Sequence, residues 1–202
     1  MSPSFRMPPR LFLLRHGRSL ANERHLIASS PVNAGDAFGL TVLGRTQVRR
    51  SVTQALAAGM LESPVLLVSS PLLRARESAD IAAELLGVSP TIDARLSERG
   101  FGDFELEPDD RYERVWAADR RDATHRSWGV ESVADVVGRA GPVVDEAALD
   151  EHAATVILST HGDVASALLC SSLGVPLEQH REVGALETGT LRELSRASGS
   201  AR

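Results

Sequence analysis

The chain has 202 residues, of which 43% are hydrophobic and 24% are charged, and its formal net charge is −5. All 22 basic residues are arginines, so the sequence contains no lysine. This excludes Schiff-base enzymes, pyridoxal-phosphate enzymes and Walker-type nucleotide kinases, because each needs a lysine in its site. The single cysteine, Cys170, excludes an internal disulfide and any zinc or iron–sulfur site built from several cysteines.

Charge and hydropathy also restrict the partners. The mildly acidic balance argues against general nucleic-acid binding, which needs a dense basic face. No apolar run approaches the about 18 residues of a membrane span, and the first ten residues do not form a signal peptide. We therefore expect a cytoplasmic protein with no nucleic-acid or membrane partner, and a homodimer is a possible assembly. The expected division is an N-terminal tail over 1–9, one domain over 10–194 and a polar C-terminal tail over 195–202.

The N-terminal half predicts an alternation of strands and helices. The apolar run Leu11–Leu14 predicts a buried strand, and Thr41 is the predicted N-cap of a helix that extends to about residue 59. A second apolar strand is predicted over Val65–Val68, followed by a helix that begins at Ser70-Pro71 and ends near residue 87. A short strand is expected at Thr91-Ile92. The first helix should bury one stripe, formed by Val42, Val48, Val52 and Leu56.

The C-terminal half continues this alternation. Helices are predicted over 109–121 and 132–149, and Gly141-Pro142 should kink or split the second of them. The run Thr155–Leu158 predicts a third buried strand, with a helix over 162–174 and a last strand over 189–194. Strands that are apolar without alternation are typical of a parallel sheet covered on both faces. The predicted fold is a three-layer α/β/α sandwich with a mainly parallel central sheet.

Two long polar segments interrupt the alternation, over residues 20–40 and 98–131. Gly, Pro, Asn and Asp residues interrupt the first segment, and Gly, Pro and Asp residues interrupt the second. Excursions of this length in a compact domain are usually lids or binding loops. We refer to them as the first and second lid segments and expect them to form a small helical lid beside the site.

Basic side chains follow each of the three predicted strands that are apolar throughout. Arg15 and His16 end the first strand, Arg74 lies shortly after the second, and His161 follows the third. The carboxyl ends of parallel strands meet at one edge of a sheet, so these side chains should lie together. Arginine forks and helix N-termini bind phosphate oxygens well. Arg74 is expected in the first turn of its helix, where the helix dipole disfavours a cation, and bound phosphate would account for it.

These residues are part of an ordered set of motifs. The set resembles the histidine phosphatase superfamily, which contains the cofactor-dependent phosphoglycerate mutases and their phosphatase relatives. Arg-His-Gly alone is a weak signal, whereas five motifs in the right order are a specific one. The motifs are Arg15-His16-Gly17 with Ser19 and Asn22, Leu40-Thr41 with Gly44 and Gln47, Ser70-Pro71-Leu72-Leu73-Arg74-Ala75, Leu96-Ser97-Glu98 with Gly102, and His161-Gly162.

The resemblance implies a two-step phosphoryl transfer with named roles. His16 matches the nucleophile that forms a phosphohistidine, and Glu98 matches the proton donor to the leaving oxygen. His161 matches a catalytic member of the phosphate pocket. The remaining phosphate-binding positions match Arg15, Arg74, Asn22 and Gly162.

The same chemistry is reasonable from the residues themselves. A neutral imidazole is a competent nucleophile, and fixed arginines stabilise charge without reorganising. Glu98 must hold its proton near neutral pH, so we expect a raised pKa. It stands in a carboxylate-rich stretch, so the alternative is a solvated acidic loop. Neither a metal nor another cofactor is required, because arginines replace the metal clamp.

This sequence departs from the family pattern in ways that concern the substrate. Arg18 stands where the family commonly has glutamate, and it adds a cation beside His16. We expect Arg18, Ser19, Arg24 and Arg99 to contact a small, negatively charged phosphate ester. The long C-terminal extension of full mutases is missing, which favours hydrolysis over mutase exchange.

Three alternatives to a metal-independent phosphatase remain open. One is a phosphoglycerate mutase-type phosphotransferase, which shares the active site and differs in product. Another is a mononuclear metal hydrolase, although paired histidines four apart on one helix are absent. The third is a non-catalytic phospho-ligand binding protein, which would keep the arginines and not need Glu98.

Overall fold

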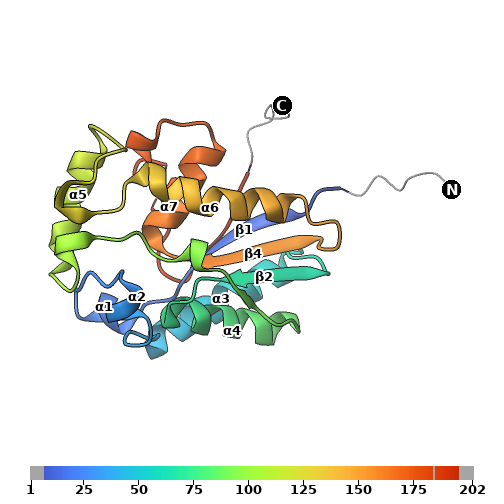
Figure 1. Ribbon diagram of the computed structural model, residues 1–202. Coiled ribbons are helices and arrows are strands. Elements are labelled where there is room, and N and C mark those ends of the chain that lie inside the picture. Colours follow the sequence, from blue (N-terminus) through green and yellow to red (C-terminus); the bar gives the residue numbers. More distant parts are fainter. Residues whose placement is uncertain (1–6, 184, 196–202) are drawn as a thin grey trace.

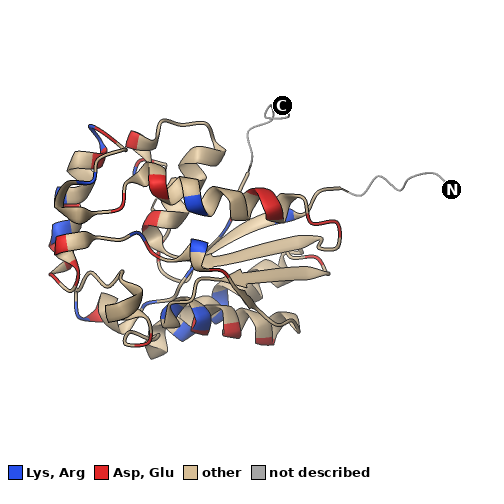
Figure 2. Cartoon of the chain, in the orientation of Figure 1, with Lys and Arg blue, Asp and Glu red and all other residues tan. Residues whose placement is uncertain are grey.

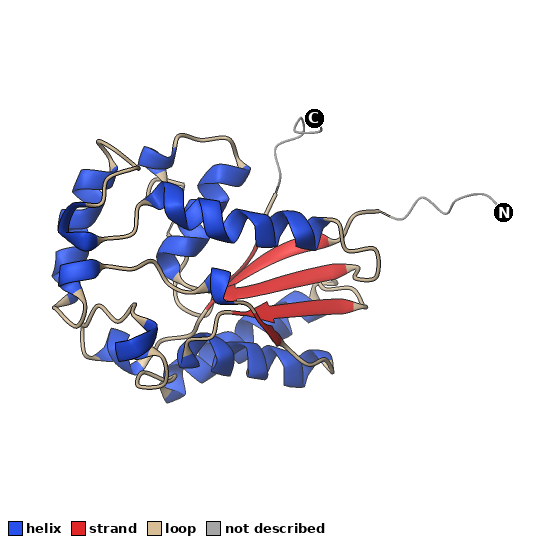
Figure 3. Cartoon of the chain, viewed as in Figure 1, coloured by secondary structure: helices blue, strands red, loops and turns tan. Residues whose placement is uncertain are grey.

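A five-stranded sheet forms the centre of the protein, in the order β3-β2-β4-β1-β5. The computed structural model describes residues 7–183 and 185–195. Strand β1 pairs with β4, β4 with β2 and β2 with β3 in parallel, and β5 pairs antiparallel with β1 (Figure 3). The strands are β1 (Arg10–Arg15), β2 (Val65–Ser69), β3 (Thr91–Ile92), β4 (Thr155–Thr160) and β5 (Leu191–Glu193). All five were predicted, and the mainly parallel sheet is confirmed.

Helices cover both faces of this sheet and complete the predicted three layers. Helices α6 (Val133–Ala148) and α7 (Gly162–Ser172) lie on one face, and α3 (Val42–Ala57) and α4 (Leu73–Leu86) lie on the other (Figure 1). The division into one domain with two tails remains a prediction, because residues 1–6 and 196–202 lie outside the described part of the chain. Among the helices of the described residues, none has the length and apolar character needed to cross a bilayer.

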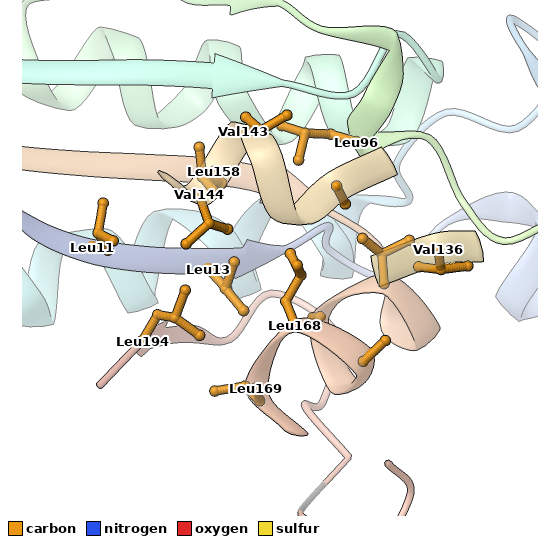
Figure 4. Packing of buried hydrophobic residues seen from close by; sticks show 14 of the residues in the cluster. Leu11, Leu13, Leu96, Val136, Val143, Val144, Leu158, Leu168, Leu169 and Leu194 are labelled. Atoms are coloured by element: carbon orange, nitrogen blue, oxygen red, sulfur yellow. The ribbon is translucent and has the colours of Figure 1, made fainter. Parts of the chain in front are cut away.

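Alternate side chains of β1 enter different halves of the core. Leu11 and Leu13 pack with α6 and α7 on one face of the sheet (Figure 4). Phe12 and Leu14 pack with α3 and α4 on the other. Covering on both faces removes the need for alternating polar residues, which explains the unbroken apolar runs. The central strand β4 and its neighbour β2 carry no charged residue, whereas β1 and β5 carry Arg10, Arg15, Arg192 and Glu193. Most of the other charged residues lie on helices and loops (Figure 2).

The buried face of α3 differs from the predicted stripe. Thr41 is the N-cap as expected, with its hydroxyl accepting from the amide of Gly44 at 3.0 Å. Val42 is 84% exposed and Leu56 is 36% exposed, so both were wrongly assigned to the core. The buried residues of α3 are Gly44, Val48, Val52 and Ala55. Two of these are small, so their contribution to the helical periodicity was invisible to a search for large apolar side chains.

Two details of the other helices also correct the sequence prediction. Helix α4 begins at Leu73 with Leu72 as its N-cap, because the hydroxyl of Ser70 is bound to His161 and does not cap the first turn. Arg74 is nevertheless in the first turn. Helix α6 continues through Pro142 without being split. Pro142 and Gly138 are exposed, so the carbonyl left without an amide donor faces solvent, where water satisfies it.

Both lid segments lie beyond the carboxyl ends of the strands, at the left of Figure 1. The first contains α1 (Leu20–Glu23) and α2 (Pro31–Ala34), and the second contains α5 (Tyr112–Asp119) and short 3-10 turns. Backbone hydrogen bonds join them: Ile27 donates to Glu107 at 2.9 Å, and Leu106 donates to Ile27 at 2.7 Å. A small separate apolar cluster supports this junction, formed by Ile27, Phe101, Phe104, Val115 and Val130.

The exposure pattern of α3 provides a matched pair of substitutions. Val48→Ala should lower the free energy of unfolding by about 2 kcal/mol, because Val48 is fully buried. Val42→Ala should leave it unchanged or raise it slightly, since that side chain is exposed and alanine favours the helix. Urea unfolding followed by circular dichroism measures both. Equal effects of the two substitutions would contradict the assigned face of α3.

Candidate active site

The carboxyl edge of the sheet brings together the histidines and arginines that the sequence singled out. Arg15 is the last residue of β1, His16 follows it, and His161 follows β4. The imidazole rings of His16 and His161 meet edge to face, with their centroids 5.2 Å apart. A cavity of about 260 Å³ opens beside His16, lined by Arg15, His16, Ser19, Ala21, Asn22, Leu26, Ala28, Arg74, Glu98, Asp109, Tyr112, Trp116, Gly162, Asp163 and Arg181.

The hydrogen bonds of His16 fix its tautomer. Its Nδ1 lies 2.8 Å from the carbonyl oxygen of Gly17, which can only accept, so Nδ1 carries the ring proton. Nε2 accepts a hydrogen bond from Nε of Arg74 at 3.1 Å and therefore holds a lone pair. Burial, reinforced by the positive charges of Arg74 and Arg15, holds the pKa of His16 well below its usual value of 6.5. His16 is therefore a neutral imidazole whose Nε2 is available as a nucleophile.

Close backbone contact holds His16 in place. A Cβ atom added to Gly17 would lie 2.2 Å from the carbonyl oxygen of Gly44. The loop after β1 therefore touches the first turn of α3, and this contact requires glycine at position 17. The signal for this residue in the sequence was the glycine of the Arg-His-Gly motif.

Three buried polar atoms around His16 lack a hydrogen-bond partner within the described residues: Arg15 Nε, Arg74 Nη1 and His161 Nδ1. Other atoms of the same side chains are anchored. Arg15 Nη1 donates to the carbonyl of Leu186, and Arg74 Nη2 donates to the carbonyl of Ala28 at 2.9 Å. Arg15 and Arg74 line the cavity, and His161 packs against His16 behind it. Buried polar atoms are normally satisfied, so unpartnered atoms beside this cavity indicate an anionic ligand with several acceptor oxygens.

His161 is also held as a neutral ring. Its Nε2 lies 2.7 Å from Oγ of Ser70, and that oxygen accepts from the amide of Leu72. The hydroxyl proton of Ser70 is then free to bind Nε2, which leaves the ring proton of His161 on Nδ1. Burial lowers the pKa of His161 well below 6.5, and the charge of Arg74 lowers it further. Nδ1–H is accordingly a neutral hydrogen-bond donor.

Gly162 allows Arg15 to lie against the start of α7. A Cβ atom at position 162 would be 3.2 Å from Cζ of Arg15. A side chain at this position would require the guanidinium to shift by a few tenths of an ångström. The contact gives Gly162 a steric role beside the phosphate-binding role expected from the sequence.

Glu98 comes from the second lid segment and lines the same cavity. Its Oε1 accepts from the amide of Arg99 at 2.9 Å. Burial raises the pKa of Glu98, the negative charge of Asp163 raises it further, and Arg74 opposes this rise. The direction agrees with the requirement for an acid that keeps its proton near neutral pH.

Asn22 and Ser19 form one turn on the cavity wall. Ser19 is the N-cap of α1, and both its amide and its hydroxyl lie 3.0 Å from Oδ1 of Asn22. The carbonyl oxygen of Asn22 is therefore engaged, and its amide nitrogen is the group that it could offer to a phosphate oxygen. Ser19 itself is fully buried.

Arg99, which the sequence analysis expected to contact the substrate, is engaged by other groups of the protein. Its side chain is 1% exposed, and its two terminal nitrogens donate to the two carboxylate oxygens of Asp119 at 2.7 and 2.8 Å. Its Nε donates to the carbonyl of Glu131 at 2.7 Å. Arg18 and Arg24 do not line the cavity either, and Arg24 is exposed at the end of α1. Asp119 lies 20 residues from Arg99 in the sequence, so no local pattern indicated that the two side chains meet.

The structure adds cavity residues that the sequence reasoning missed, among them Asp109, Tyr112, Trp116, Asp163 and Arg181. Asp163 directly follows His161-Gly162, so its position in the motif was a usable signal. Nothing near Arg181 in the sequence pointed to the site, because its segment lacks regular periodicity.

The described residues contain no group of three His, Cys, Asp or Glu side chains that could hold a metal ion. The donors around His16 are instead arginine and neutral histidine N–H groups. These are suited to an anionic ligand, and they do not form a metal-binding set.

The family model of the histidine phosphatase superfamily (branch 1) matches residues 11–202. The chain belongs to this superfamily. It is 32% identical over 200 residues to the glucosyl-3-phosphoglycerate phosphatase of Mycobacterium tuberculosis, covering 92% of this chain and 85% of that protein. The similar protein named "Probable phosphoglycerate mutase GpmB" from Yersinia enterocolitica is 25% identical over 178 residues, covering 86% of this chain and 79% of that protein.

Solved structures of the superfamily agree with the fold. The mycobacterial glucosyl-3-phosphoglycerate phosphatase in complex with VO3 has a TM-score of 0.75 and 27% identity, covering 94% of this chain and 100% of that one. Its complex with inorganic phosphate has a TM-score of 0.73 and 29% identity, covering 93% and 89%. The predicted family, fold and enzyme class are confirmed: the protein is a phosphomonoesterase of the histidine phosphatase superfamily.

The burial of His16 and His161 predicts an unusual titration. Both rings should stay neutral at pH 6 in the folded protein, because burial and the neighbouring arginines disfavour the imidazolium. Their folded pKa values lie below the unfolded value of 6.5, so the unfolded chain binds more protons. The free energy of unfolding should therefore fall as the pH drops below about 6.5 toward the folded pKa values.

Nuclear magnetic resonance of the histidine rings across a pH titration measures the pKa values of His16 and His161 in the folded protein. The same resonances in urea-unfolded protein provide the reference titration near pH 6.5. A native His16 resonance that titrates at or above this reference would show that the ring is not held neutral.

Proposed function

We propose that the protein hydrolyses small phosphate monoesters through a phosphohistidine at His16, without a metal ion or other cofactor. The observation that carries this is the set of buried, unpartnered atoms of Arg15, Arg74 and His161 around His16, whose neutral Nε2 lies in hydrogen-bond contact with Arg74. These donors suit the equatorial oxygens of a phosphoryl group, while Nε2 suits in-line attack. Asn22 and the N-terminus of α7 at Gly162 would supply further hydrogen bonds to phosphate.

In the first step, the phosphate would take over the arginine donors. A charged oxygen is a stronger acceptor for Arg74 than the imidazole nitrogen that it binds in the free enzyme. The Nε2 lone pair of His16 then forms a bond to phosphorus as the bond to the ester oxygen breaks. Glu98 donates its proton to that oxygen, so the alcohol leaves as a neutral molecule.

In the second step, water would hydrolyse the phosphoenzyme. Glu98, now a carboxylate, accepts a proton from water as the water oxygen attacks phosphorus. The bond between phosphorus and Nε2 breaks, and His16 returns to its neutral form. Retention of the ring proton on Nδ1 by the carbonyl of Gly17 supports the same tautomer throughout the cycle.

The substrate class follows from the relatives and from the space around Glu98. The relatives are named for glucosyl-3-phosphoglycerate and for phosphoglycerate. Each of these molecules carries both a phosphate ester and a carboxylate. We propose a small phosphorylated hydroxy acid for this enzyme. Glu98 also lines a second hollow of about 480 Å³ beside Ser30, Gly100 and Glu131. A larger substituent on the leaving alcohol would extend into this hollow.

A cytoplasmic location is part of the proposal, and it rests on the free, buried Cys170 and the absence of membrane-spanning helices in residues 7–183 and 185–195. A homodimer remains a prediction. The mutase alternative uses the same residues and differs only in whether the phosphoryl group passes to water or to a second hydroxyl.

The phosphoenzyme can be trapped. Brief reaction with a radiolabelled phosphate ester, followed by alkaline denaturation, should leave acid-labile label on the protein, and His16→Ala should abolish both labelling and turnover. His152→Ala is the matched control and should behave like the parent, because His152 is an exposed residue outside the cavity. The assay is run with and without a chelator.

Three results would change this assignment. Labelling that persists in His16→Ala would refute the nucleophile. Loss of activity in chelator would indicate a metal hydrolase. Isomerisation of phosphoglycerate faster than phosphate release would indicate the mutase.

The role of Glu98 depends on the leaving group. Glu98→Gln should reduce kcat/KM for glycerol 3-phosphate by about 10²- to 10⁴-fold, because an alkoxide leaves poorly without a proton. Its effect on kcat/KM for p-nitrophenyl phosphate, which reports formation of the phosphoenzyme, should be far smaller, since nitrophenolate needs no proton to leave. The later hydrolysis of the phosphoenzyme, which also uses Glu98, should slow equally for both esters. Glu107→Gln, in the exposed part of the same acidic stretch, is the control. Equal losses of kcat/KM with both esters would indicate a structural role for Glu98.

A further inference from the structure

The cavity contains a third arginine that the phosphate chemistry does not use. Arg181 follows the 3-10 helix Leu177–Gln179, and its side chain lines the cavity together with Arg15 and Arg74. It is mostly buried, with 19% of the side chain exposed. Arg18 and Arg24, expected from the sequence to contact the substrate, do not line the cavity.

Two contacts hold the guanidinium of Arg181 in one orientation. It stacks on the indole of Trp116, with Cζ 3.9 Å from the ring centroid. Its Nη1 donates to Oδ1 of Asp163 at 3.0 Å. Oδ2 of Asp163 accepts from Nε1 of Trp116 at 3.1 Å, so the three side chains form a closed set. A guanidinium fixed in this way loses little entropy when it binds a further group.

Arg181 retains donors for a ligand. A guanidinium has five N–H groups, and the hydrogen bond that the described residues give to Arg181 uses one of them. Stacking on Trp116 covers a face of the guanidinium and leaves N–H groups at its edge. Its charge is also felt inside the phosphate pocket, since after burial and the charge of Glu98 it is the next largest influence on the pKa of Arg15, which it lowers.

The acidic groups around Arg181 do not fully offset this charge. Asp163 is shared, because it also accepts from Arg99 at 3.4 Å. Oδ2 of Asp109, the other aspartate on the cavity wall, lies 3.1 Å from Nδ1 of His25, and the described residues show no hydrogen bond or ion pair between Asp109 and Arg181. An anionic group that enters the cavity beside the phosphate would therefore meet an oriented, incompletely compensated cation.

We propose that Arg181, held by Trp116 and Asp163, binds a carboxylate of the substrate while Arg15 and Arg74 bind its phosphate. This rests on the proposed function and makes its substrate class specific: a phosphorylated hydroxy acid with both groups on one short carbon chain. The planar fork of arginine matches the two oxygens of a carboxylate. A cavity of about 260 Å³ suits one phosphate and one such group.

A pair of substrates that differ in one group tests this. 3-Phosphoglycerate and glycerol 3-phosphate have the same chain, with a carboxylate in the first and a hydroxymethyl group in the second. Arg181→Gln should lower kcat/KM for 3-phosphoglycerate by about tenfold or more and for glycerol 3-phosphate by less than about twofold. Arg50→Gln, an exposed arginine on α3, should change neither value.

Arg181→Lys serves if Arg181→Gln does not fold, as judged by thermal unfolding. Lysine keeps the charge without the fork, so the loss should again be confined to 3-phosphoglycerate and should be smaller. Equal losses on both substrates would overturn the proposal and assign Arg181 to the structure of the phosphate pocket. No loss on either substrate would overturn it as well.

Binding separates this proposal from the catalytic one. In the His16→Ala background, calorimetry with 3-phosphoglycerate and glycerol 3-phosphate measures recognition without turnover. Arg181→Gln should weaken binding of 3-phosphoglycerate alone. If the parent enzyme hydrolyses neither ester but this selective weakening is seen, the proposed function fails and the carboxylate site stands. If hydrolysis depends on His16 but Arg181→Gln does not weaken binding of 3-phosphoglycerate, the proposed function stands and the carboxylate site fails.

Discussion

The site depends on two cations that are held out of water. Arg15 and Arg74 are largely buried, and burial lowers the pKa of both guanidinium groups. Desolvating a cation is costly unless hydrogen bonds and opposite charges compensate it. Here carbonyls of Leu186 and Ala28 do so in part, and Glu98 contributes from the lid. The rest of the compensation is left to the ligand. Burial is the main reason that His16 stays neutral, and the same two charges lower its pKa further, so the groups that bind the anion also help to keep the nucleophile neutral.

A second charge network connects the lid to the sheet. Asp119 of α5 is fully buried and accepts both terminal nitrogens of Arg99, while Asp163 of α7 joins Arg99 to Arg181. Arg99 directly follows Glu98 in the chain. The acid of the proposed reaction is thus anchored through its neighbour to both the lid and the start of α7. Buried pairs of this kind are sensitive to the loss of a partner, because the remaining charge is left uncompensated.

The strands and the strand-end residues could be predicted from the sequence because both are local patterns. Unbroken apolar runs identified β1, β2 and β4, and the rule that parallel strands share an edge brought His16 and His161 together. Arg99 and Arg181 were not predictable in this way. Arg99 had the expected charge but is buried in an ion pair with Asp119. Arg181 stands in a segment without regular periodicity, yet it lines the cavity. The difference was decided by partners distant in the sequence, Asp119 and Asp163, which no local pattern reveals.

The hydrogen bonds between the two lid segments have a consequence for how the entrance can open. Ile27 is both donor and acceptor across the junction, to Glu107 and from Leu106. Neither segment can swing away alone without breaking these bonds and exposing the apolar cluster around Phe101 and Phe104. Ala28, which holds Arg74, directly follows Ile27, and Glu98 lies at the start of the other segment. Widening the entrance for a bulkier ester therefore requires changing both segments together, and grafting a single loop from a relative would disturb an arginine and an acid at once.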